Sequence, residues 1–376
     1  CPNRPTWGLT LKKAGAVDWK EKILLPRSKT PGVDFVYTQC QDRMKSFRGT
    51  NRVYSNLKIQ PYVLPNFVLS EHSISKPNVM VLLLDSLSWK RMELFLPKTS
   101  KFLQRIETAY AFKLTSTVGY NTGPNAKIIF GNGEVFKKAQ GMVTSLFEDY
   151  SPDHVLAKMY PYEHYKISGK NILGNYGNDL TQLYYHNPVP GCMHGEFWIQ
   201  QHLAYIRKFW DIYPNKRKFH VSKMYGCHMQ RSHIVACQQN DVPLNMFLKS
   251  YHAKYPNTFL FLMSDHGFHW RKTGKFNEIL PGEYEHRNPM LYVISPKSSS
   301  TLKSNTKRFI SHYDVHQTLT GLLSGQSTKK GINLLTEQVP LGRSCKDAGV
   351  PKNWCNCFVK ADSTFHLDSQ EGQIQR

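Results

Sequence analysis

Two continuous apolar runs of strand length stand out in the hydrophobic pattern. The first lies in NVMVLLLD, which begins at residue 78, and the second in NTFLFLMSDHG, which begins at residue 257. A third run, PMLYVIS, begins at residue 289. Runs without polar alternation are typical of strands that are buried on both faces within a parallel sheet. We therefore expect the first two runs to be buried strands of a parallel sheet and the third to be a further strand.

Helical spacing of apolar side chains follows or precedes these runs. Residues 98–112, 241–255 and 312–323 repeat apolar positions at the helical period, and the first of these predicted helices extends through Tyr110. Strands that alternate with helices predict an α/β fold: a layered α/β/α sandwich with a mostly parallel central sheet. The basic, polar residues 295–308 are typical of a solvated connector between such elements.

The pattern also divides the chain into segments. Residues 1–75 are interrupted by prolines and predict an irregular, strand-rich N-terminal extension. The layered core is expected over residues 76–330. A cysteine-containing segment, residues 331–358, would pack on that core, and the polar residues 359–376 predict a disordered tail.

The charge of the chain is strongly basic, with 49 Lys and Arg against 27 Asp and Glu and a formal net charge of +22. Such a surface attracts anionic small molecules, lipid headgroups and glycans, and charge alone does not choose among them. No RRM, homeodomain or zinc-finger pattern is present, which argues against sequence-specific nucleic-acid binding. No apolar run has the length of a membrane span. The sequence leaves the oligomeric state open.

Eight cysteines suggest an oxidising compartment. Cys345, Cys355 and Cys357 cluster in CKDAGVPKNWCNC, whose spacing differs from the paired C-x-x-C of a zinc ribbon. We therefore favour disulfides, and with them an extracellular or secretory-lumen location, without a predicted connectivity. Because the chain begins at Cys1, we expect a fragment or a processed form, and a preceding segment could hold a membrane anchor.

Two of the predicted buried strands end in an acid. Asp85 follows VMVLLL, and Asp265 follows FLFLM directly before His266. Functional groups of open α/β sheets gather at the carboxyl ends of the strands, and an ionised carboxylate beside a core needs a cation or a donor. These three side chains therefore form a candidate set of ligands for a divalent metal. The alternative is that each Asp caps a turn or helix.

A third candidate element is VGYNTGPNAKIIFG, residues 118–131. Thr122 lies two residues before Pro124, and proline is favoured in the first turn of a helix, so Thr122 is expected near a helix N-terminus. Backbone amides at such a position favour an anion. The Thr122 hydroxyl could be a nucleophile, but the local sequence alone favours a plain N-cap.

Several motifs occur together in a fixed order. They are PNVMVLLLDSLSWKRMELFLPKTSKFL, VGYNTGPN, PVPGCMHG, MSDHGFHW, EYEHRNPMLYVISP, YDVHQTL and CKDAGVPKNWCNC. This series resembles the DUF229 family, which looks like a branch of the alkaline phosphatase/sulfatase superfamily. The resemblance covers residues 76–358, and the ordered set is more specific than any single motif. It implies an alkaline phosphatase-like fold, with residues 76–330 as the catalytic domain.

The resemblance also implies roles for the candidate residues. Asp85, Asp265, His266 and Thr122 match a one-metal site for Zn, Mn or Ca, in which Thr122 is the nucleophile. The implied function is a metal-dependent hydrolase or phosphotransferase that acts on phosphoesters, or less readily on sulfoesters, since conventional sulfatases use Cys or Ser at the nucleophile. Asn121 could donate to the developing oxyanion.

Further positions are less clearly assigned. Asn125 is a second candidate donor to the oxyanion. His228 and His286 could bind a second metal or the substrate, although His286 also fits an exposed loop. Met224 stands where two-metal members carry an Asp, and Met is a poor ligand for a hard cation. The alternative to an enzyme is therefore a catalytically degenerate family member that binds polyanionic glycan or lipid surfaces through its basic face.

Overall fold

The computed structural model describes most of the core of the chain. The described ranges are 76–139, 141–148, 155–161, 166–167, 192–193, 196–228, 233–268, 280–328 and 330–356, together with four strands near the N-terminus. These strands form two antiparallel pairs, β1 (Trp7–Gly8) with β2 (Ile23–Leu24) and β3 (Phe35–Lys45) with β4 (Asn51–Ile59). The predicted tail, residues 359–376, lies outside the described residues. The division into four segments stays a prediction.

A seven-stranded sheet forms the centre of the molecule. Its strands, in spatial order, are β6 (Ala109–Ala111), β14 (Leu291–Ile294), β13 (Thr258–Met263), β5 (Asn78–Leu84), β12 (Lys218–Met224), β8 (Val143–Glu148) and β9 (Lys166–Ile167). The five strands from β13 to β9 pair in parallel, and β14 runs antiparallel to both of its neighbours. The predicted mostly parallel sheet is confirmed, and β5 lies between β13 and β12.

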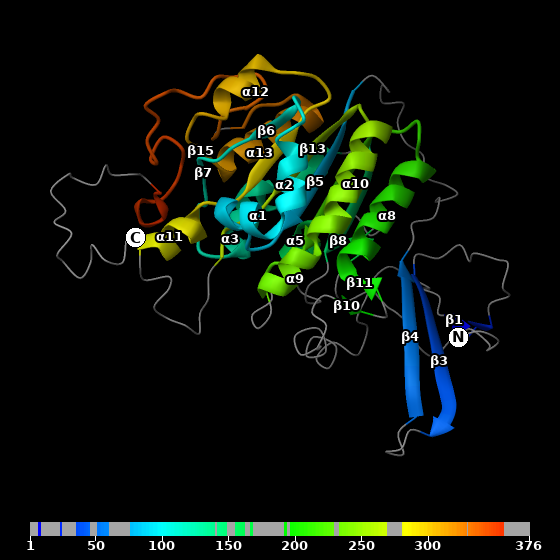
Figure 1. Cartoon of the computed structure of the whole chain (residues 1–376). Helices are drawn as coiled ribbons and strands as arrows, with labels where there is room; N and C mark the ends of the chain where they lie inside the picture. The colour runs from blue at the N-terminus through cyan, green and yellow to red at the C-terminus, as the bar shows by residue number, and fades with distance from the viewer. Residues whose placement is uncertain are drawn as a thin grey trace, which may run out of the picture.

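Helices cover both faces of this sheet (Figure 1). One face packs against α1 (Trp89–Phe95), α2 (Pro97–Leu103), α8 (Trp198–Ile212), α9 (His233–Gln239) and α10 (Asp241–Lys254). The other packs against α3 (Thr122–Ile129), α4 (Glu134–Lys138), α5 (Val155–Met159), α12 (Ser300–Asn305) and α13 (His312–Ser324). The strand β5 serves both layers, since Met80, Leu82 and Leu84 face the first group while Val79, Val81 and Leu83 face the second. The predicted three-layer sandwich is confirmed.

The remaining elements are short. Two small strand pairs, β7 (Thr115–Ser116) with β15 (Ile310–Ser311) and β10 (Cys192–Met193) with β11 (Glu196–Phe197), lie outside the main sheet. The helix α11 (Leu280–Arg287) follows residues that are not described, and the 3₁₀ helices η1 (Gly131–Gly133) and η5 (Lys352–Trp354) are single turns.

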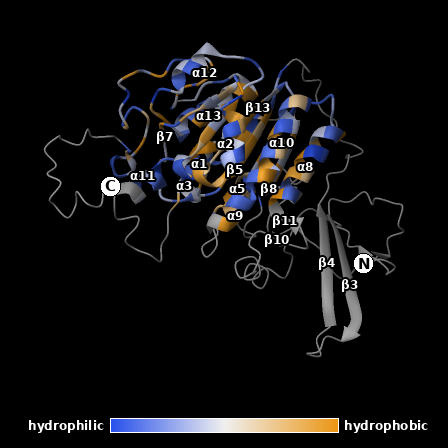
Figure 2. Cartoon of the chain, in the orientation of Figure 1, coloured by the Kyte–Doolittle hydropathy of each residue, from blue (hydrophilic) through white to orange (hydrophobic). Residues whose placement is uncertain are grey.

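Two predicted helices are confirmed and one is too long. The elements α10 and α13 match the predicted ranges, and their apolar faces turn toward the sheet (Figure 2). The predicted helix over 98–112 ends at Leu103, and Tyr110 lies in β6. The chain turns back where the amide of Ala109 donates to the carbonyl of Ile106, because β6 pairs with β14 at the edge of the sheet.

The predicted connector over 295–308 is also not a plain loop. It contains α12, whose N-terminus is capped by Ser299 Oγ accepting from the amide of Leu302 at 3.2 Å. Leu302 is fully buried. A single buried leucine among polar neighbours gives little periodicity, because only one turn of the helix touches the core.

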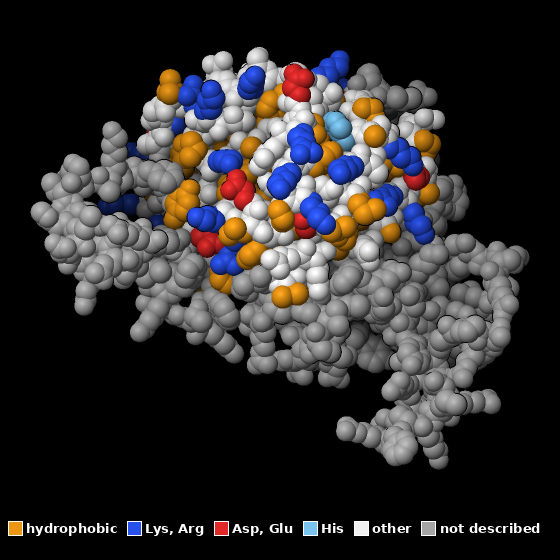
Figure 3. All heavy atoms as spheres, in the orientation of Figure 1, with side chains coloured by type: hydrophobic (Ala, Val, Ile, Leu, Met, Phe, Trp, Pro, Cys, Tyr) orange, Lys and Arg blue, Asp and Glu red, His pale blue; other side chains and the backbone are white. Residues whose placement is uncertain are grey.

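Two disulfides lie in the described part of the chain, Cys227–Cys237 and Cys345–Cys355. Within the same residues, no helix combines the length and the hydrophobicity that a membrane crossing requires. Lys and Arg side chains are spread over the face shown in Figure 3, with Asp and Glu among them, rather than gathered in one patch.

Candidate metal and nucleophile site

Asp85 lies at the carboxyl end of the central strand β5 and is fully buried. Its amide donates to the carbonyl of Met224, which continues the pairing of β5 with β12. The next residue, Ser86, has a φ of 61° and donates from Oγ to Asp85 Oδ1 at 2.9 Å. A positive φ at a non-glycine residue is a strained conformation, and it is held here by the contacts of a buried turn.

Asp265 and His266 follow the neighbouring strand β13 and are also fully buried. Asp265 Oδ1 accepts from the amides of Ser86 at 3.4 Å and His266 at 3.1 Å. His266 Nδ1 lies 2.8 Å from the carbonyl oxygen of Gly267, which only accepts, so Nδ1 carries the proton. In the neutral ring, the lone pair of Nε2 is then directed to the two carboxylates.

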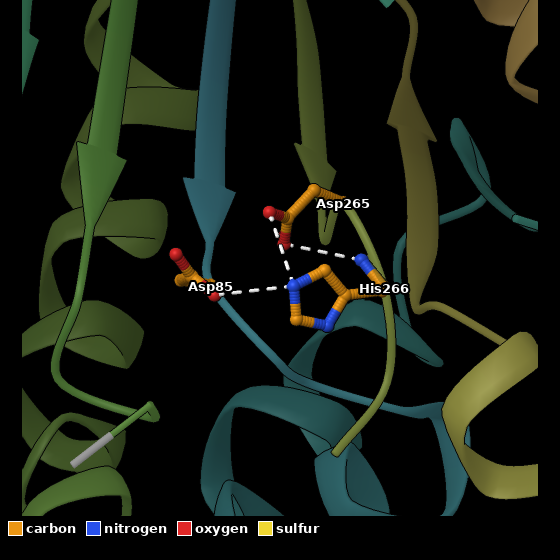
Figure 4. A group of neighbouring side chains, drawn as sticks. All are labelled: Asp85, Asp265 and His266. Carbon is orange, nitrogen blue, oxygen red and sulfur yellow. Dashed lines mark hydrogen bonds and ion pairs between the residues drawn. The ribbon is translucent and has the colours of Figure 1, made fainter. Parts of the chain in front are cut away.

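These three side chains converge at one point (Figure 4). His266 Nε2 lies 3.7 Å from Asp85 Oδ1 and 3.6 Å from Asp265 Oδ2. One potential ligand atom from each residue lies within 4.8 Å of the others. The strand order explains this, since β5 and β13 are adjacent and parallel and their carboxyl ends meet at one edge of the sheet.

Gly267 completes the turn after these residues. An added Cβ would lie 1.8 Å from the carbonyl oxygen of Glu285, so that only glycine fits between the turn and α11. The amide of Gly267 also donates to the carbonyl of His286 at 2.8 Å. The SDHG sequence is therefore held against α11 by its backbone.

Thr122 reaches the same group from α3, which belongs to the second helix layer. It is the first residue of α3 and 7% exposed, and its Oγ1 donates to Asp85 Oδ2 at 3.3 Å. The N-cap position belongs to Asn121, whose side chain makes no capping hydrogen bond. The plain N-cap interpretation of Thr122 is therefore wrong, because its hydroxyl points to Asp85 and not to the amides of its own helix.

Asn125 holds the turn before Thr122. Its Oδ1 accepts from the amides of Val118 and Gly119, and its Nδ2 donates to the carbonyls of Gly119 and Asn121. Asn125 is fully buried, and both of its amide protons bond to these carbonyls. Asn125 thus positions the turn, and its expected donation to an oxyanion stays a prediction. Asn121 is exposed, and its proposed donor role stays a prediction.

Lys223 is the member of this group that the sequence did not reveal. It lies near the end of β12, is fully buried, and its Nζ donates to Asp85 Oδ2 as an ion pair. Burial alone would lower the pKa of Lys223, but the carboxylates of Asp85, Asp265 and Glu148 outweigh burial and raise the pKa above its ordinary value. The ammonium therefore stays charged.

Asp85 is likewise held in its charged form. Burial raises the pKa of its carboxyl, but the ammonium of Lys223, with smaller contributions from the neighbouring imidazoles of His228 and His266, outweighs that effect and leaves the pKa well below its ordinary value. An anionic oxygen is what a metal ligand at this position requires.

His228 and His286 flank His266 without joining the converging ligand atoms. The ring of His228 is half-buried and its centroid lies 6.3 Å from that of His266. His286 lies on α11 and is 4% exposed, with its ring 5.7 Å from His266. The exposed-loop interpretation of His286 is therefore wrong. Burial lowers the pKa of His286 to about 4, and its Nε2 donates to the carbonyl of Tyr120 at 2.6 Å.

The C-terminal cysteine segment reaches the same place. The ring of Trp354 lies 5.4 Å from His286 and 5.8 Å from Tyr120. The Cys345–Cys355 disulfide closes the segment next to Trp354. The side wall of the site therefore combines an aromatic ring from this segment with the turn that leads to Thr122.

A solved structure shares this fold. The chain is similar to the C-terminal periplasmic domain of EcEptC from Escherichia coli, with a TM-score of 0.50, 14% identity and coverage of 82% of this chain and 98% of that chain. It is also similar to a protein in the alkaline phosphatase superfamily from Vibrio parahaemolyticus, with a TM-score of 0.49, 15% identity and coverage of 75% and 76%. The predicted fold class, a layered α/β/α sandwich with a mostly parallel central sheet, is confirmed by the sheet topology and by the first of these structures.

The chain is also similar to the soluble domain of lipooligosaccharide phosphoethanolamine transferase A from Neisseria meningitidis. Its TM-score is 0.46 at 12% identity, with coverage of 68% of this chain and 90% of that chain. No curated protein matches the chain. The model of the family described as "Protein of unknown function (DUF229)" matches residues 12–157 and 178–375. Since this match spans most of the sequence, the chain belongs to the DUF229 family.

Proposed function

We propose that the chain is a metal-dependent hydrolase or phosphotransferase that acts on phosphoesters, with Thr122 as the nucleophile. The observation that carries this proposal is the approach of the Thr122 hydroxyl to Asp85, 3.3 Å from Oδ2, in the buried group that also contains Asp265 and His266. A threonine hydroxyl is a weak nucleophile unless a metal or a base activates it. This arrangement supports activation by a metal.

The donor set fits a divalent ion held by Asp85, Asp265, His266 and Thr122. Among the described residues, no group donates a hydrogen bond to the buried Oδ2 of Asp265. A buried anionic oxygen without a donor needs a cation. Because Ca²⁺ prefers a shell of oxygen atoms, the imidazole nitrogen favours Zn²⁺ or Mn²⁺. A bound ion would supply Lewis acidity to the phosphoryl oxygen and lower the pKa of the hydroxyl.

Each of these residues then has its own role in the reaction. The Asp85 carboxylate orients the Thr122 hydroxyl, and Asn125 fixes the turn that presents it. Thr122 Oγ loses its proton to solvent and forms a bond to phosphorus, while the bond from phosphorus to the ester oxygen breaks and that oxygen takes up a proton and leaves as the alcohol. Water or an acceptor alcohol then attacks the same phosphorus and releases Thr122. Water gives hydrolysis and an alcohol gives transfer.

The substrate class and location form part of the same proposal. The formal charge of +22 fits an anionic substrate such as a lipid headgroup or a phosphorylated glycan. The two disulfides support an extracellular or lumenal location, where disulfides persist. Thr122 cannot be converted to formylglycine as Cys and Ser are, which places phosphoesters ahead of sulfoesters.

The test measures the hydrolysis of an aryl phosphate and an aryl sulfate by the purified chain with Zn²⁺ or Mn²⁺. We expect turnover of the phosphate, and Thr122→Ala should lower kcat/KM roughly a thousandfold or more because the nucleophile is lost. Thr306→Ala is the matched control, since this threonine only bonds to a carbonyl of α12. Mass spectrometry of quenched reactions should find the phosphoryl group on Thr122.

The second candidate is the degenerate family member that binds polyanionic surfaces. The observation in its favour is Met224 at a position where two-metal relatives carry an Asp. Heparin or anionic vesicle binding that is equal in the wild type and in Thr122→Ala, without turnover by either protein, would support this candidate and contradict the enzyme.

A further inference from the structure

Lys223 is buried among carboxylates that approach from three strands. It pairs in register with Leu83 of β5 and with Glu148 of β8, and both Lys223 and Glu148 are fully buried. Its ion-pair partner is Asp85, directly after β5. Taking an ammonium out of water costs several kcal/mol unless an anion compensates it, so that this lysine must be balanced by its neighbours.

The two oxygens of Asp85 have different partners. Oδ2 accepts from Lys223 Nζ and from Thr122 Oγ1, while Oδ1 faces His266 Nε2 at 3.7 Å. The ammonium and the nucleophile hydroxyl thus share one acceptor atom, and His266 faces the other oxygen. An anion that reaches Thr122 therefore comes close to the charge of Lys223.

We propose that Lys223 is the second cation of this site, a fixed ammonium that competes with the metal ion for Asp85 and attracts the phosphoryl group to Thr122. This inference rests on the proposed function, since it takes the metal and the phosphoester substrate from it. Without a metal, the ammonium balances the buried carboxylates. With a metal, it is the positive charge on the Thr122 side of Asp85.

The two parts of the inference give effects of opposite sign. Removal of a positive charge beside two metal ligands strengthens the binding of a cation, and it weakens the binding of an anion at the same place. A lysine that only fills space or only supports the fold would weaken both or change neither. Tighter cation binding together with weaker anion binding is therefore the result that distinguishes a second cation from a structural lysine.

The experiment compares the wild type with Lys223→Met and uses Mn²⁺ and inorganic phosphate as probes. By calorimetry, Lys223→Met should bind Mn²⁺ roughly tenfold or more tightly than the wild type. In the Mn²⁺-loaded proteins, phosphate should bind roughly tenfold or more weakly to the variant. Lys208→Met is the matched control, because it removes a lysine of α8 outside this group, and both affinities should stay at the wild-type values.

The outcomes separate this inference from the proposed function. If the wild type binds no divalent ion, the proposed function is contradicted, because it requires a bound metal. If the wild type binds Mn²⁺ but Lys223→Met binds it equally or more weakly, or binds phosphate as well as before, the second-cation role is overturned. If Lys223→Met does not fold, Asp85→Asn combined with Lys223→Met should restore folding by neutralising the pair. Failure of the double variant to fold also overturns the inference.

Discussion

Replacing Asp265 by asparagine separates metal binding from stability. Asp265 Oδ1 accepts backbone hydrogen bonds that an asparagine oxygen can keep. The other oxygen is buried, accepts no hydrogen bond in the described part of the chain, and lies 3.6 Å from His266 Nε2. One carboxylate oxygen of Asp265 lies within 4.8 Å of one of Asp85. Two unit charges at that distance repel by about 3 kcal/mol at an effective dielectric constant of about 20. Asp265→Asn removes this repulsion together with the attraction of Lys223.

Because these two effects oppose each other, the free energy of unfolding of the metal-free variant should differ from that of the wild type by no more than about 1 kcal/mol. The bound metal, in contrast, loses a charged ligand, which should weaken its affinity roughly a hundredfold or more. Thermal unfolding with and without Zn²⁺ or Mn²⁺ measures both effects. At a metal concentration about a hundredfold above its Kd, the wild type should gain about 2.7 kcal/mol, and the variant should gain almost nothing.

The matched control is Asp241→Asn. Asp241 is also a buried carboxylate, but it accepts from the amides of Lys98 and Thr99 at the start of α2, away from the metal ligands. This variant should be destabilised and still respond to metal. A large loss of metal-free stability in Asp265→Asn, or an unchanged metal response, would refute the assignment of Asp265 as a ligand.

Two further predictions concern stability away from the ligands. Replacing Cys345 and Cys355 by serine opens a loop with a sequence separation of 10 and should cost about 3 kcal/mol by chain entropy, measured by urea unfolding; an unchanged midpoint would contradict this. Burial lowers the pKa of His220 to about 3, so the unfolded chain binds the proton first, and stability should fall as the pH drops from about 6.5 toward 3. His220→Phe should flatten that fall by about 1.4 kcal/mol per pH unit in urea titrations, and an equal slope in both proteins would refute it.

The fold could be predicted where burial is continuous. After their first residues, Asn78 and Thr258, the strands β5 and β13 have only apolar side chains, and α13 repeats its core residues at the helical period. The strand β12 was missed, although all seven of its residues are buried. Its first five residues, KFHVS, alternate polar and apolar positions, which is typical of a half-exposed strand. Two of its polar residues are tolerated in the core because distant segments supply partners, His202 for Ser222 and Asp85 for Lys223.

The candidate site also contains residues that the sequence predicted and one that it did not. Asp85, Asp265 and His266 were visible because an acid that directly follows an apolar strand is a local signal. Lys223 gave no such signal, since its partner Asp85 is 138 positions away and only the parallel register of β12 on β5 brings the two together. The omission matters for chemistry, because a site of two carboxylates without Lys223 would hold two uncompensated negative charges until a metal arrived. With Lys223, the metal-free site is already partly balanced. On the proposed function, a metal ion would compete with Lys223 for Asp85, so that the affinity of the site would depend on this lysine as well as on the ligands.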